Sequence, residues 1–185
     1  KKLNAYTDHL DLVIICAGTC EYDDGPTMSL DVYERVMRTN FLGAINTARI
    51  ALPLLQNSSM GARIVGVSSL SALAPFPRAE AYGASKAALE YFLQSLKVDL
   101  AHQNIGVTVV RPGFVDTPMT KKNDFSMPFI ISSKSAADKI LAGIAKEKLF
   151  VNFPWKMSLP LTLFGMLPRL WLNSIAPKFR KTETL

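Results

Sequence analysis

Apolar residues follow two patterns along the chain, and the two patterns alternate. Short continuous apolar runs, rich in β-branched residues, are typical of strands buried in a parallel sheet. Longer segments whose apolar residues recur every three to five positions are typical of helices with one buried face. The predicted strands cover residues 10–17, 62–69, 106–112 and 149–153. The predicted helices cover residues 30–55 and 80–103, and a further helix begins at Ser135.

This alternation predicts one α/β domain over residues 1–185, built on a Rossmann-like, doubly wound parallel sheet. We expect about four strands with flanking helices on both faces of the sheet. In such open sheets, ligands bind at the carboxyl ends of the strands, so the functional residues should lie there.

The C-terminal segment, residues 153–185, is apolar but is interrupted by Pro160, Pro168 and Arg169. These residues argue against a continuous membrane-spanning helix. We favour a helical segment that folds over the substrate side of the domain or onto a partner subunit. The less favoured alternative is an interfacial element whose Trp, Phe and Leu side chains face a membrane surface while its Lys and Arg face the headgroups.

The composition narrows the range of functions. The chain has 185 residues, is 49% hydrophobic and carries a net charge of +6. No stripe of basic and aromatic residues predicts nucleic acid as a partner. Cys16 and Cys20 are too few for a disulfide scaffold, and neither His9 nor His102 lies at a familiar ligand spacing from them, so no metal site is predicted. The N-terminus has no initiator Met and no signal-peptide pattern, so we expect a cytoplasmic protein whose sequence here starts inside a longer domain.

A serine, a tyrosine and a lysine form the candidate chemical centre. Tyr82 and Lys86 are four residues apart on a predicted helix, so they share one face of it. An ammonium near the phenol favours the phenolate and should lower the tyrosine pKa from its ordinary value of about 10. Ser69 precedes Tyr82 by 13 residues and ends the second predicted strand, where its hydroxyl could hold a reacting oxygen. Ser68 should point to the opposite face, and Ser71 could line the same cleft.

These residues occur in order with three further motifs: CAG at 16–18, Asn40 in RTNFLGAINTA, and RPGFVDTPM at 111–119. The combination resembles the short-chain dehydrogenase/reductase family of Rossmann-fold oxidoreductases. The resemblance extends over nearly the whole chain. It implies an enzyme that interconverts an alcohol and a carbonyl with NAD or NADP as cofactor.

The resemblance also implies a role for each matching residue. Tyr82 would be the general acid or base, Ser69 would polarise the substrate oxygen, and Lys86 would bind the nicotinamide ribose. Asn40 would anchor a water molecule in a proton relay. The implied cofactor-binding residues are Cys16, Ala17, Gly18, Tyr82, Lys86, Pro112, Gly113, Val115 and Thr117. The candidate substrate-lining residues are Ser71, Phe114 and Met119. An apolar small-molecule substrate is suggested by Phe114, Met119, Phe125 and Phe129.

Two departures from the family pattern bear on the cofactor. The chain has Cys16 where the family has asparagine, and a buried structural cysteine is the expected role for it. None of the ten glycines form the glycine-rich phosphate loop that should cradle a pyrophosphate at a helix N-terminus. The sequence therefore corresponds to the part of the family fold from the fourth strand onward and leaves NAD and NADP undistinguished.

The family strand order, 3-2-1-4-5-6-7, would leave the strand at 10–17 as an open edge. We expect either further strands of the intact protein or another chain to pair with it. The family's helices corresponding to 30–55 and 80–103 commonly form subunit interfaces, so a homodimer or homotetramer is expected.

Three functional hypotheses follow. The first is an NAD(P)-dependent oxidoreductase that uses serine, tyrosine and lysine for acid–base catalysis. The second is a non-catalytic Rossmann-like remnant that acts as a binding or scaffold module. The third is a membrane-peripheral reductase of lipid-like substrates. The joint presence of Ser69, Tyr82, Lys86 and Asn40 favours the first hypothesis, because a scaffold has no physical need for all four.

Overall fold

The central feature of the structure is a four-stranded parallel sheet with the strand order β1-β2-β3-β6. The computed structural model describes residues 5–22 and 28–180. The strands are β1 (Leu12–Ile15), β2 (Ala62–Val67), β3 (Ile105–Pro112) and β6 (Phe150–Phe153). Each coincides with a predicted apolar run to within two residues at either end. The prediction of a doubly wound α/β fold is confirmed.

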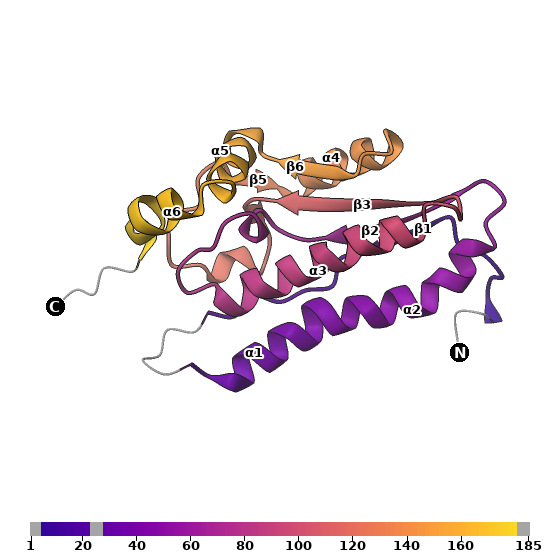
Figure 1. Ribbon diagram of the computed structural model, residues 1–185, viewed down its shortest axis with the longest axis horizontal. Helices are drawn as coiled ribbons and strands as arrows, with labels where there is room; N and C mark the ends of the chain where they lie inside the picture. The colour runs from indigo at the N-terminus through magenta and orange to yellow at the C-terminus, as the bar shows by residue number, and fades with distance from the viewer. Residues whose placement is uncertain (1–4, 23–27, 181–185) are drawn as a thin grey trace.

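Helices cover both faces of this sheet (Figure 1). The helices that do so are α2 (Gly43–Gln56), α3 (Glu80–Asp99) and α4 (Ser133–Ala145), while α1 (Leu30–Met37) packs against α3. On one face, Leu55 of α2 and Leu93 of α3 pack with Ile64 of β2. On the other face, Ala136 of α4 packs with Val110 and with Val151 of β6. Two apolar cores, one on each side of the sheet, therefore hold the strand ends in fixed positions.

The helix predicted over residues 30–55 is interrupted by a wider π-helical turn at Arg38–Leu42. Asn40 lies in that turn and is fully buried. A π turn inserts one extra residue into a helix and often occurs at functional sites. The fourth helix begins at Ser133 rather than at Ser135, because the Ser132 hydroxyl caps it by accepting a hydrogen bond from the Ser135 backbone N–H at 3.2 Å.

Strand β1 lies at one edge of the sheet and pairs only with β2 among the described residues, as predicted. Val13 and Ile15 face the core that β1 shares with α2, whereas Leu12 and Ile14 face the opposite side and are 41% and 42% exposed. Alternation along a strand explains this difference, because successive side chains point to opposite faces. One face of β1 thus presents apolar side chains, and its edge presents backbone groups that no described strand pairs with.

The segment between β3 and α4 is largely irregular, as predicted. It contains a short parallel pair of strands, β4 (Val115–Asp116) and β5 (Ile131–Ser132), and a single 3-10 turn at Thr120–Lys122. Because β4 follows directly after the Pro112–Gly113 pair, the segment starts at the carboxyl end of β3 and passes over the strand ends.

The C-terminal segment folds back onto its own chain. It forms α5 (Trp155–Gly165), the short α6 (Pro168–Leu170) and two further turns that end at Phe179. Leu161 and Trp171 pack against Leu70 and Ala74, which lie just after Ser69. The Trp171 indole N–H donates a hydrogen bond to the Pro75 carbonyl at 2.6 Å. No helix within the described ranges has the length and apolar character needed to cross a membrane.

Candidate active site

Ser69, Tyr82 and Lys86 come together where β2 ends and α3 begins. Ser69 follows β2 in an extended conformation, and its hydroxyl oxygen accepts a hydrogen bond from the Ser71 backbone N–H at 3.1 Å. The same hydroxyl lies beside the Tyr82 side chain, close enough to lower the pKa of its phenol. Ser68 points to the other side of the strand end, where it is buried against α3, as the alternation of side chains predicts.

The Tyr82 phenol is held in its protonated form. Burial raises the pKa of Tyr82 to about 12, although the neighbouring Ser69 hydroxyl acts in the opposite direction. The expectation that the Lys86 ammonium lowers this pKa is wrong, because the Lys86 Nζ lies 5.8 Å from the centre of the tyrosine ring and desolvation dominates. At neutral pH the group is therefore a proton donor.

Lys86 is buried beside the end of β2. Its Nζ donates a hydrogen bond to the Val67 carbonyl at 2.9 Å. Burial lowers the pKa of Lys86 to about 8, so both its charged and neutral forms lie within reach at moderately alkaline pH. Gly18 passes close to this ammonium: a Cβ atom at Gly18 would lie 3.2 Å from Nζ and 3.3 Å from the Asn40 Oδ1. A side chain at this position would crowd both groups.

Asn40 connects α3 to the loop after β1. Its Nδ2 donates hydrogen bonds to the Thr19 carbonyl and to the Ser85 hydroxyl, both at 2.9 Å, and its Oδ1 accepts one from the Thr19 N–H at 2.7 Å. The side chain therefore fixes the position of the Gly18–Thr19 backbone relative to Lys86.

Cys16 is exposed, so the expectation of a buried structural cysteine is wrong. It lies one residue beyond the last paired residue of β1, which is itself an edge strand. Ala17 is exposed as well. Cys20, further along the same loop, is partly buried, and burial raises the pKa of its thiol. Neither thiol replaces the amide that asparagine would offer.

The Pro-Gly segment follows β3 directly. The Gly113 N–H donates a hydrogen bond to the Phe153 carbonyl at 2.7 Å, which joins the ends of β3 and β6. The Val115 carbonyl accepts a hydrogen bond from the Thr120 hydroxyl at 2.6 Å. The Thr117 hydroxyl lies 3.2 Å from the same hydroxyl and stabilises the turn at Thr120–Lys122. The backbone of this segment is thereby held at the carboxyl edge of the sheet.

Sequence reasoning missed a group of contacts that joins three loops near Tyr82. The Arg78 guanidinium forms an ion pair with Asp124 at 2.9 Å and lies 5.1 Å from the centre of the Tyr22 ring. The Tyr22 hydroxyl donates a hydrogen bond to the Asn123 side-chain oxygen at 3.0 Å, and its ring contacts Phe125 edge to face. We call Tyr22, Arg78, Asn123, Asp124 and Phe125 the loop latch.

Arg78 adopts a backbone conformation with φ of 65°, which is uncommon for a residue with a side chain. The latch contacts span up to 101 positions of sequence, and no local pattern encodes them. The sequence offers one signal for the latch, which is a basic residue, Arg78, in the loop that precedes Tyr82.

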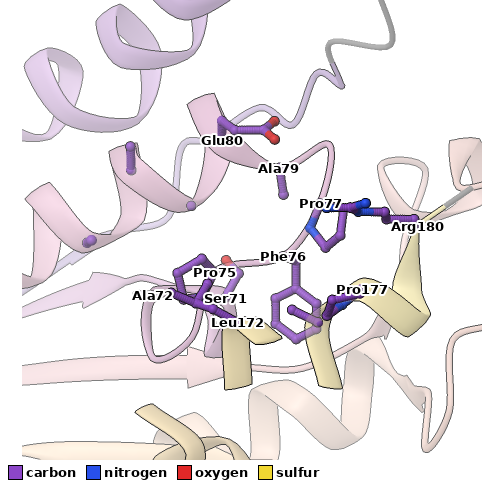
Figure 2. Close-up of a pocket in the computed structure, with 14 residues that line it drawn as sticks. Ser71, Ala72, Pro75, Phe76, Pro77, Ala79, Glu80, Leu172, Pro177 and Arg180 are labelled. Atoms are coloured by element: carbon purple, nitrogen blue, oxygen red, sulfur yellow. The ribbon is translucent and has the colours of Figure 1, made fainter. Parts of the chain in front are cut away.

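The predicted substrate-lining residues separate into two places. The Phe114 ring lies 6.0 Å from the Phe125 ring and therefore beside the loop latch, and Met119 is 37% exposed. Ser71 instead lines a cavity of about 530 Å³ between α3 and the C-terminal segment (Figure 2). Its hydroxyl oxygen is buried and has no hydrogen-bond partner within the described part of the chain. Ser69, Tyr82 and Lys86 do not line this cavity, so it lies beside the candidate active site and not in it.

A buried ion pair lies directly behind these residues. Glu90, one turn after Lys86 on α3, accepts two hydrogen bonds from the Arg111 guanidinium at 2.7 and 3.0 Å. The Ser68 hydroxyl donates to the Glu90 carboxylate at 2.7 Å. Arg111 also lies 4.0 Å from the centre of the Phe150 ring. The helix that carries Tyr82 and Lys86 is thus attached to the ends of two neighbouring strands, β2 and β3.

Comparison with known proteins assigns the family. Residues 1–127 match the family model described as short chain dehydrogenase. An uncharacterized oxidoreductase of Myxococcus xanthus is 33% identical over 180 residues, which cover 97% of this chain and 71% of that protein. The 11-beta-hydroxysteroid dehydrogenase 1A of Arabidopsis thaliana is 31% identical over 150 residues, 68% of this chain and 42% of that protein.

Among solved structures, a short chain dehydrogenase from Burkholderia cenocepacia in complex with NADP superposes with a TM-score of 0.82. It is 24% identical in sequence, and the match covers 95% of this chain and 72% of that one. The chain belongs to the short-chain dehydrogenase family, a family of oxidoreductases.

Proposed function

We propose that the protein is an NAD(P)-dependent oxidoreductase that interconverts an alcohol and a carbonyl. The observation that supports this most directly is that a partly buried Tyr82, protonated at neutral pH, lies beside the Ser69 hydroxyl with Lys86 one helical turn away. A phenol held protonated at neutral pH can donate its proton to a carbonyl oxygen that is being reduced. The Ser69 hydroxyl would polarise the same oxygen and hold it near the phenol.

The residues around Lys86 fit the nicotinamide end of such a cofactor. Gly18 leaves the space beside the Lys86 ammonium that a Cβ atom would otherwise fill. Lys86, Asn40 and the backbone from Cys16 to Gly18 would hold the ribose, with Pro112, Gly113, Val115 and Thr117 on the nicotinamide side. The cofactor, when bound, supplies the hydride. NADP is the cofactor in the Burkholderia cenocepacia complex, while the chain's own residues leave NAD and NADP equally compatible.

Each catalytic side chain then has one task. Tyr82 donates a proton to the carbonyl oxygen during reduction and accepts it back during oxidation. Lys86 binds the ribose hydroxyls of the cofactor. Asn40 keeps the Gly18–Thr19 backbone in register with Lys86 through its three hydrogen bonds, and its turn would anchor the water that returns a proton to the site.

An apolar substrate fits the aromatic residues at this end of the sheet. Phe114, Phe125 and Tyr22 form a chain of ring contacts next to the active site. Aromatic walls of this kind bind apolar bodies and leave the polar atom to be reduced at Ser69 and Tyr82. The hydroxysteroid dehydrogenase among the relatives has a name that denotes such a substrate class.

The proposal is tested by fluorescence titration of NADH and NADPH. The titration uses the 185-residue chain and the same chain with whatever residues precede it in its gene. We expect saturable binding and NAD(P)H-dependent reduction of apolar ketones by the longer protein, with weaker cofactor binding by the 185-residue chain, because it has no glycine-rich loop for the pyrophosphate. If neither protein binds either nucleotide, the scaffold hypothesis replaces the enzyme.

The loop latch predicts a further effect on substrate binding. Arg78→Ala removes the ion pair with Asp124 and the contact with Tyr22, so the three loops should close less firmly over the substrate. We expect the KM for the carbonyl substrate to rise about fivefold, equivalent to about 1 kcal/mol, with kcat changed less.

Steady-state kinetics at saturating cofactor measure this effect. Lys134→Ala is the matched control, because it removes an exposed ion pair with Asp138 on α4 and should leave KM unchanged. Equal KM values for the wild type and Arg78→Ala would show that the latch has no part in substrate binding.

A further inference from the structure

Helix α5 is apolar on two opposite faces, and its own chain covers one of them. Leu161 on the inner face is buried, and Met157 and Phe164 pack on the same core as Leu70. On the outer face, Trp155, Leu159 and Leu163 follow one another at four-residue spacing and are 69%, 57% and 53% exposed. Exposed apolar residues continue beyond the end of the helix. The outer stripe comprises Trp155, Leu159, Leu163, Met166, Leu167 and Leu170.

A contiguous apolar surface of this kind needs an explanation. Single exposed apolar residues are ordinary on protein surfaces, but several on one helix face indicate an interaction site. A helix that is apolar all round is stable only when both faces have apolar surroundings. The protein's own core provides apolar surroundings for the inner face of α5, whereas the apolar side chains of the outer face are exposed.

Charge identifies the surroundings that suit the outer face. Residues 148–180 contain no Asp or Glu. They contain the basic residues Lys148, Lys156, Arg169, Lys178 and Arg180, all exposed. Lys156 adjoins Trp155 on the exposed side of α5, and Arg169 lies between Leu167 and Leu170. Basic residues beside Trp and Leu complement an apolar layer bounded by negative charge, which is the surface of an anionic bilayer.

A second copy of the chain fits this surface less well. In a two-fold symmetric dimer the same patch meets itself, so the stripes of both copies would face each other. The basic residues of both copies would then share one interface, with no acidic residue within 148–180 to compensate them. We propose that the outer stripe docks onto an anionic lipid surface, with Trp155 and the leucines in the interfacial layer and the basic residues at the headgroups.

The position of the stripe links it to the candidate active site. The Lys156 Nζ lies 5.6 Å from the centre of the Phe129 ring, and Phe129 and Ile130 are 50% and 44% exposed. Both belong to the same irregular segment as Phe114 and Phe125. If the proposed function holds, an apolar substrate would reach the aromatic residues from the lipid side. The docking itself does not depend on that function, because its test measures no turnover.

Vesicle flotation tests the docking. The whole protein is mixed with vesicles of phosphatidylcholine alone or of equal parts of phosphatidylcholine and phosphatidylserine. We expect it to float with the anionic vesicles only, and less as salt is added. Trp155→Ser/Leu159→Ser/Leu163→Ser should lower the partition coefficient at least about tenfold, because three exposed apolar side chains are lost. Lys156→Ser/Arg169→Ser should lower it about fivefold for each basic residue removed.

The control is Tyr91→Ser/Val98→Ser, which removes two exposed apolar residues of α3 and should leave flotation unchanged. Failure of the wild type to float on anionic vesicles would overturn the proposal, as would equal flotation on neutral vesicles. Light scattering after gel filtration tests the remaining alternative, which is that the outer stripe is a subunit interface. If the wild type is an oligomer that the triple serine variant dissociates, the stripe is a subunit interface and the proposal is wrong.

Discussion

Tyr82→Phe is expected to lower kcat for carbonyl reduction about a thousandfold while the affinity for NADPH stays within about twofold of the wild type. The change deletes one hydroxyl and keeps the ring, so the packing of α3 against the sheet is preserved. The deleted hydroxyl is the proposed proton donor, and it lies beside the Ser69 hydroxyl. Stopped-flow measurement of NADPH oxidation, with a separate fluorescence titration of NADPH, gives the two quantities independently.

Tyr91→Phe is the matched control for this experiment. Tyr91 lies on the same helix but is 79% exposed, and removal of its hydroxyl should change neither kcat nor the NADPH affinity. Turnover by Tyr82→Phe close to that of the wild type would remove Tyr82 from the proposed mechanism. A parallel loss of cofactor affinity would instead assign it a binding role.

The features that the sequence predicted are those set by short-range patterns. The strands follow from continuous runs of β-branched residues, and the shared face of Tyr82 and Lys86 follows from their spacing of four residues. The opposite orientations of Ser68 and Ser69 follow from the alternation of side chains along a strand. Each of these inferences uses only neighbours in sequence, and each agrees with the structure.

The features that it could not predict depend on contacts between distant segments. The pKa of Tyr82 is raised because the folded chain buries the phenol, and burial is not encoded in the spacing to Lys86. Cys16 is exposed because β1 ends before it at the edge of the sheet. Arg78 meets Asp124 only because two loops separated by a strand and a helix close over the same strand ends.

The buried pair of Glu90 and Arg111 is expected to have the largest effect on stability. Glu90→Leu removes the carboxylate that pairs with the Arg111 guanidinium. The Arg111 side chain is only 12% exposed. Breaking a buried ion pair from one side costs about 3–5 kcal/mol, because the remaining charge keeps its desolvation penalty without compensation. The free energy of unfolding should therefore fall by about that amount, as measured by urea denaturation followed by circular dichroism.

The double variant Glu90→Leu/Arg111→Met separates the charge effect from the loss of packing. Removing both charges eliminates the unpaired guanidinium, so most of the lost stability should return. Asp138→Ala is the control for an exposed pair and should cost less than about 0.5 kcal/mol. A double variant as unstable as Glu90→Leu alone would contradict the electrostatic explanation and assign the loss to packing around Phe150. If stability returns in the double variant but kcat is lower than in the wild type, the pair positions the helix that carries Tyr82 and Lys86, because α3 then lacks the contacts of the Glu90 carboxylate with Ser68 and Arg111.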